Sequence, residues 1–196
     1  MEKRELRSNY IIAFINLFLL LIFFCFAYSF TKELIKVFRL NEAIRIWIFF
    51  FGLSFPFIFY TFVVDLNNAY EKVQYFFFRS TFLNLVVPSL LIILLVGYFL
   101  FPKIFGISFN KDIFLFLGSF SFAAHLVFVA RQTKSTSFTG FINYFFSMTM
   151  IYIFILIIFG VYLLIGYDYS LKTALCNGTK NGFILIKEII LQLFPQ

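Results

Sequence analysis

The sequence has few charged residues and few of the residues that metal sites, disulfides and catalytic motifs require. Only 13% of its 196 residues are charged, whereas a soluble globular domain carries about a quarter. Hydrophobic residues make up 62% of the chain, which is more apolar surface than a water-soluble domain could cover. This composition excludes an ordinary soluble domain and predicts an integral membrane protein.

Cysteine and histidine are almost absent. Cys25 lies inside an apolar run and Cys176 in a polar stretch, and neither belongs to a Cys-x-x-Cys motif. His125 is the single histidine and has no cysteine close to it in the sequence. Metal sites and disulfides need several such residues at suitable spacing, so we expect no metal, no cofactor and no disulfide.

Acidic residues are scarce and avoid the apolar runs. All nine Asp and Glu lie outside these runs or at their ends, and Asp65 directly follows one of them. Ion-coupled carriers usually keep an ionisable group at mid-membrane, so this pattern disfavours an ion-coupled transporter that works alone. Catalytic triads, phosphate-binding loops and zinc-protease motifs are absent too, so no catalytic residue is assigned and an enzyme is disfavoured.

Five apolar runs are long enough to cross a bilayer, which takes about 20 predominantly apolar residues. The backbone must satisfy its own hydrogen bonds in hydrocarbon, so each run should be an α-helix. We therefore predict an all-α, polytopic transmembrane helical bundle that forms a single integral membrane domain over residues 1–196. The expected spans are residues 10–30, 47–64, 81–101, 113–130 and 142–166.

A basic amphipathic segment follows the first run. In residues 31–45, Lys32, Lys36 and Arg39 fall on one side of a helix and apolar residues on the other. This pattern predicts a helix at the membrane interface. We expect its three cations to contact lipid headgroups, preferentially anionic ones.

The remaining connections are less regular. Residues 65–80 are predicted as a loop that ends in an interfacial aromatic cluster, and an equal alternative is that the third span extends back toward Tyr75. Pro88 predicts a kink or a close approach in the third span. Near the end of the chain, Asn177-Gly178-Thr179 is interpreted as a turn, and residues 181–194 predict a short amphipathic helix that does not span the membrane.

The fourth span carries a candidate functional face. Gly118, Ser121 and His125 follow an i, i+3, i+7 spacing, so they share one side of a helix, and Arg131 stands at its end. His125 could relay protons, bind a lipid headgroup or ligate a metal with help from another chain, but a hydrogen bond to a neighbouring helix is the favoured interpretation. Arg131 could hold a lipid phosphate or a partner's carboxylate, but the favoured interpretation is that it simply reaches the headgroups.

Polar residues also lie within two other spans. Asn16 stands among Phe and Leu in the first span, and Asn143 and Ser147 share a face of the fifth. They could contact a substrate, although hydrogen bonding between packed helices is the favoured interpretation.

The expected function is that of a non-enzymatic structural or accessory subunit of a membrane assembly. The alternatives are a small oligomeric transporter or channel lined by the His125 face, and a lipid-modifying enzyme. We expect other membrane subunits or copies of the chain as partners. Nucleic acid is not expected, because the cations stand between apolar runs. The side of the membrane that holds the C-terminus carries a slight excess of Lys and Arg. This excess favours a cytoplasmic C-terminus, in a plasma or inner membrane.

Overall fold

The protein is entirely helical in the residues that the computed structural model describes, which are 2–40, 45–62, 66–106, 109–133, 138–167 and 170–193. No strand occurs within these ranges, so the predicted all-α class is confirmed for them. The helices are α1 (Glu2–Leu40), α2 (Ile46–Phe62), α3 (Leu66–Phe77), α4 (Thr81–Val86), α5 (Ser89–Phe105), α6 (Lys111–Gln132), α7 (Phe138–Tyr167) and α8 (Leu171–Leu193).

Three of these helices are long and apolar enough to cross a membrane, which indicates a membrane protein. The segments are Tyr10–Lys36 of α1, the whole of α6, and Gly140–Tyr167 of α7. The apolar helices α2 and α5 have 17 residues each. At 1.5 Å per residue each is about 26 Å long, slightly less than a hydrocarbon core of about 30 Å. The expected total of five spans therefore stays a prediction.

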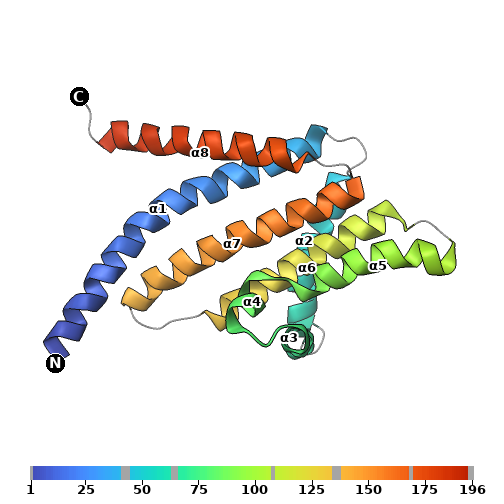
Figure 1. The fold of residues 1–196 in the computed structure, drawn as a ribbon, viewed down its shortest axis with the longest axis horizontal. Coiled ribbons are helices and arrows are strands. Elements are labelled where there is room, and N and C mark those ends of the chain that lie inside the picture. Colours follow the sequence, from blue (N-terminus) through green and yellow to red (C-terminus); the bar gives the residue numbers. More distant parts are fainter. Residues whose placement is uncertain are drawn as a thin grey trace.

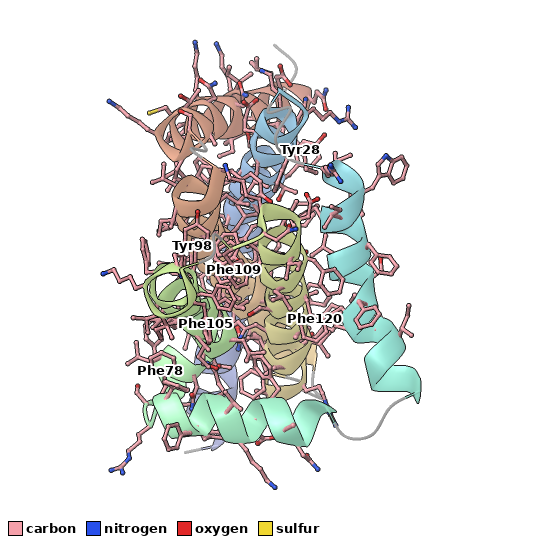
Figure 2. The ribbon with its side chains drawn as sticks, turned by 90° about the vertical axis from the view of Figure 1, so that its right-hand side faces the viewer. Tyr28, Phe78, Tyr98, Phe105, Phe109 and Phe120 are labelled. Carbon is pink, nitrogen blue, oxygen red and sulfur yellow. The ribbon has the colours of Figure 1, made fainter. Side chains whose placement is uncertain are left out.

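The long helices lie side by side. Figure 1 shows α1, α7, α6 and α5 as neighbouring rods, with α8 along the outer side of α1. α2 packs against α6, and α3 crosses one end of the bundle, as Figure 2 shows. α1, α5, α6 and α7 are each followed by a helix that runs back in roughly the opposite direction, whereas α2 leads into the crossing helix α3.

A buried aromatic part of the core lies between α6 and α7. The rings of Phe114 and Tyr162 stack with centroids 4.0 Å apart, and the Tyr162 hydroxyl donates a hydrogen bond to the Phe114 carbonyl at 2.6 Å. Gly118 faces the Tyr162 ring, and a Cβ at position 118 would overlap this ring. Its lack of a side chain therefore lets α6 and α7 approach closely.

The predicted single helix over residues 81–101 is wrong, because the chain forms two helices there. α4 ends at Val86, and Val87 and Pro88 are extended before α5 begins at Ser89. Proline lacks an N–H group and disfavours helical geometry at the residue before it, which explains the interruption. α5 then continues beyond residue 101 to Phe105.

The first predicted span and the start of the predicted interfacial helix form one continuous helix, α1, of 39 residues. Residues 31–40 continue α1 without interruption, and residues 41–44 lie outside the described residues. Lys32, Lys36 and Arg39 are exposed, while Leu34 and Phe38 are buried. A separate helix over 31–45 is therefore not seen, and its interfacial position stays a prediction.

The C-terminal helix begins earlier than expected. α8 starts at Leu171 rather than residue 181, and Asn177-Gly178-Thr179 is helical rather than a turn. Ala174, Gly178 and Gly182 are buried on one side of α8, and a Cβ on either glycine would overlap the ring of Phe30 or Phe26 of α1. A stripe of small residues thus lets α8 pack closely along α1.

The prediction of a loop over residues 65–80 is wrong, because α3 occupies most of this stretch. Tyr70 and Gln74 are one helical turn apart on its buried side, whereas Tyr75, Phe76 and Phe77 are exposed. α3 is therefore an amphipathic helix whose polar buried residues reach the interior of the bundle. Asp65 lies outside the described residues.

Candidate functional site at a broken helix

The interruption between α4 and α5 leaves backbone groups without helical partners, and Gln74 of α3 supplies three of the missing hydrogen bonds. Its Nε2 donates to the carbonyls of Asn84 at 2.9 Å and Val87 at 2.6 Å. Its Oε1 accepts from the backbone N–H of Ser89 at 3.1 Å. The Gln74 side chain is fully buried. Because unpaired backbone groups are costly away from water, this one amide side chain stabilises the break at three backbone groups.

His125 of α6 also forms a hydrogen bond with the backbone next to this break. It is 0% exposed, and its Nε2 lies 3.1 Å from the carbonyl oxygen of Leu85 in α4. A carbonyl only accepts, so Nε2 donates; the neutral ring then accepts at Nδ1 from the Tyr70 hydroxyl at 2.7 Å. Both ring nitrogens are therefore occupied by neighbouring helices.

Aromatic rings pack against His125. Phe128 stacks on His125 with centroids 5.8 Å apart and also contacts Tyr70 at 5.5 Å. The Tyr70 and Phe128 side chains are buried as well. The imidazole is thus held in an apolar enclosure, which strengthens its two hydrogen bonds relative to water.

Several polar atoms around the break have no hydrogen-bond partner among the described residues. These buried groups are both amide atoms of the Asn84 side chain and the hydroxyls of Ser89 and Ser121. A buried polar group left unpaired costs about 1–3 kcal/mol. An additional polar molecule or side chain would therefore gain hydrogen bonds at these groups more readily than elsewhere in the bundle.

The predicted functional face on α6 points into the protein. Gly118 packs against Tyr162, and Ser121 and His125 are both 0% exposed. Arg131 is separate from this buried set: it is exposed on the last turn of α6. It lines a cavity of about 200 Å³ together with Glu71, Phe128 and Gln132.

Two of the three predicted packing residues contact each other. The Asn16 side-chain Nδ2 donates to the Asn143 Oδ1 at 2.7 Å, which links α1 to α7. Ser147 is partly buried one turn further along α7. Hydrogen bonds of this kind between membrane helices contribute about 0.6 kcal/mol on average.

The sequence patterns did not identify Gln74, Tyr70 or Glu33 as important. The spacing of Tyr70 and Gln74 is compatible with one helix face, but the assignment of a loop concealed it. Glu33 lies within the candidate span of α1, against the expectation that every acid would avoid the spans. It is 4% exposed, accepts from Asn181 of α8 at 3.0 Å, and lies 3.8 Å from the Lys36 ammonium.

Among the described residues, no three His, Cys, Asp or Glu side chains come together in a way that could hold a metal ion. Comparisons with protein-family models, with curated proteins and with solved structures found no match to this chain.

Proposed function

We propose that this chain is a non-enzymatic, multi-pass structural or accessory subunit of a membrane assembly. The observation that carries this proposal is the use of both His125 ring nitrogens by Tyr70 and Leu85. A catalytic or proton-relaying histidine needs a nitrogen that substrate or water can reach. Here the only histidine stabilises the break between α4 and α5, which favours a structural role.

The surface of α1 is the best candidate for contact with a partner subunit. In the candidate span of α1 only 17% of the most apolar stretch is buried, compared with 61% in α6. Phe14 and Phe18 are 73% and 62% exposed on this helix. Packing of a second membrane helix would bury these rings by close van der Waals contact, the main source of helix association in lipid.

Copurification tests this proposal. The tagged full-length chain, extracted in mild detergent, should carry at least one further membrane protein in a fixed ratio. Phe14→Ala with Phe18→Ala should release that partner. The matched variant Phe99→Ala with Phe105→Ala, which truncates exposed rings of α5, should retain it. A chain that elutes alone as a monomer and transports a solute after reconstitution would contradict the proposal.

The broken helix supports a second candidate function, transport through an oligomer of this chain. Transporters often bind their substrates at interrupted membrane helices, where backbone and side-chain groups are free to bind a ligand. The unpaired Asn84 and Ser89 groups stand at such an interruption. Flux into reconstituted vesicles that is lost in Asn84→Ala and retained in Asn143→Ala would favour transport, whereas the absence of flux in the wild-type chain would count against it.

A further inference from the structure

Two cavities meet on one side of α1. The first, of about 590 Å³, is lined by Tyr28, Thr31, Ile35 and the three exposed cations Lys32, Lys36 and Arg39. The second, of about 410 Å³, is apolar. Its lining comes from three helices and consists of Phe24 and Ala27 of α1, Leu126 of α6, and Met148, Thr149 and Tyr152 of α7, together with the two residues shared with the first cavity.

Tyr28 and Thr31 line both cavities, so the two form one groove with a basic end and an apolar end. At their junction the Thr31 hydroxyl lies 2.8 Å from the Tyr152 hydroxyl, which joins α1 to α7. Tyr28 is 54% exposed at the edge of the groove and is labelled in Figure 2. The groove therefore presents polar and apolar surfaces in a fixed order along α1.

The basic end carries more positive than negative charge. Among the described residues that line it, none is acidic, and the Glu33 carboxylate lies 3.8 Å from the Lys36 ammonium. Glu33 is buried and also accepts a hydrogen bond from Asn181, so it offsets only part of one of the three cations. An anion at this end would be attracted by at least two cationic side chains.

We propose that this groove binds one anionic phospholipid. Its phosphate would lie against Lys32, Lys36 and Arg39, and an acyl chain would run past Phe24, Ala27 and Met148. A free anion would account for the basic end alone, and a neutral apolar molecule for the other end alone. An amphiphile with a negatively charged headgroup matches both.

The length of the groove agrees with this ligand. Phe24 and Arg39 are 15 residues apart on one continuous helix. At 1.5 Å per residue this separation is about 22 Å. One leaflet of a bilayer that is about 40–45 Å thick with its headgroups measures about the same. A single lipid of ordinary length therefore extends from the cations to the end of the apolar lining.

Native mass spectrometry of the full-length chain tests this proposal. The protein is released from detergent micelles that contain equal amounts of phosphatidylglycerol and phosphatidylcholine, and each bound lipid is counted. The charge-removal variant is Lys32→Gln with Lys36→Gln and Arg39→Gln. Its matched control, Lys103→Gln with Lys180→Gln and Lys187→Gln, removes three exposed cations from α5 and α8. Circular dichroism checks that each variant keeps its helices.

We expect the wild-type chain to retain one phosphatidylglycerol in preference to phosphatidylcholine by about 25-fold or more, since each of at least two cations near an anionic lipid contributes roughly a fivefold preference. The charge-removal variant should lose this preference, and the control should keep it. Thr149→Phe, which fills the apolar end, should lower the occupancy of both lipids several-fold without changing their ratio.

Four results would overturn the proposal. One is a wild-type chain without preference between the two lipids, and another is a control that loses the preference as fully as the charge-removal variant. A third is displacement of phosphatidylglycerol by inorganic phosphate at equal concentration, which would assign the basic end to a free anion. The last is a lipid-free dimer that the charge-removal variant dissociates, which would assign the groove to a second copy.

Discussion

Replacement of Gln74 by leucine should strongly destabilise the protein. Leucine is similar in size but makes no hydrogen bonds, so the Asn84 and Val87 carbonyls and the Ser89 N–H would all lose their partner. At about 1–3 kcal/mol for each buried unpaired group, the free energy of unfolding should fall by about 3–9 kcal/mol. A typical domain has only about 5–15 kcal/mol in total.

Gln132→Leu is the matched control. Gln132 is exposed on α6, and its side-chain hydrogen bond to Glu71 is long at 3.4 Å. Exposed substitutions of this kind change the free energy of unfolding by less than about 0.5 kcal/mol. The two variants therefore make the same chemical change at a buried and at an exposed position.

Unfolding by a denaturing detergent, followed by circular dichroism, measures both free energies. Hydrogen exchange adds a local measurement, because in Gln74→Leu the amides of α4 and of the first turn of α5 should exchange faster than those of α7. A Gln74→Leu variant as stable as Gln132→Leu, with unchanged exchange at residues 81–92, would refute the reasoning. The break would then be stabilised by groups other than Gln74.

The other predictions concern single contacts. His125→Phe removes the hydrogen bonds to the Tyr70 hydroxyl and to the Leu85 carbonyl and should cost about 3 kcal/mol by the same unfolding assay. Tyr70→Phe removes the hydrogen bond to the imidazole Nδ1 and should cost about 1–2 kcal/mol, so equal costs would contradict the assigned pairing. Leucine side chains in the variant Gly178→Leu with Gly182→Leu would overlap the rings of Phe30 and Phe26, so this variant should separate α8 from α1. Maleimide should then label the buried Cys25 faster, measured in a Cys176→Ser background. Gly97→Leu, which meets no atom within 4 Å, should leave that labelling rate unchanged, and a rise in both variants would exclude a specific effect at α8. A double-mutant cycle of Asn16→Ala and Asn143→Ala should give a coupling free energy of about 0.6 kcal/mol, and a value indistinguishable from zero would show that this hydrogen bond does not stabilise the packing of α1 on α7.

The distribution of hydrophobic residues predicted three of the observed helices. The predicted and observed ends of α2, α6 and α7 agree to within a few residues. Long apolar runs carry this information locally, because a membrane-buried backbone has no partner for its polar groups other than itself. The i, i+3, i+7 spacing placed Gly118, Ser121 and His125 on one side of a helix. All three are buried.

Prediction failed where packing between distant segments decides the local structure. α3 is helical because Tyr70 and Gln74 find partners on α4, α5 and α6, which lie 10 or more residues away in the chain. α8 includes Gly178 and Gly182, which are poor helix formers on their own. Their small size stabilises the structure only because it lets α8 pack closely against the rings of α1.

The sequence by itself determined that this protein is all-helical and suited to a membrane, because apolar length and the need for internal backbone hydrogen bonds are properties of each segment alone. The tertiary structure decided which side chains form hydrogen bonds with the backbone at the break between α4 and α5, and where the groove on α1 lies. His125 and Leu85 are 40 positions apart, and the Thr31 and Tyr152 hydroxyls 121. Contacts over such separations depend on which helices are neighbours, and no local periodicity encodes that choice.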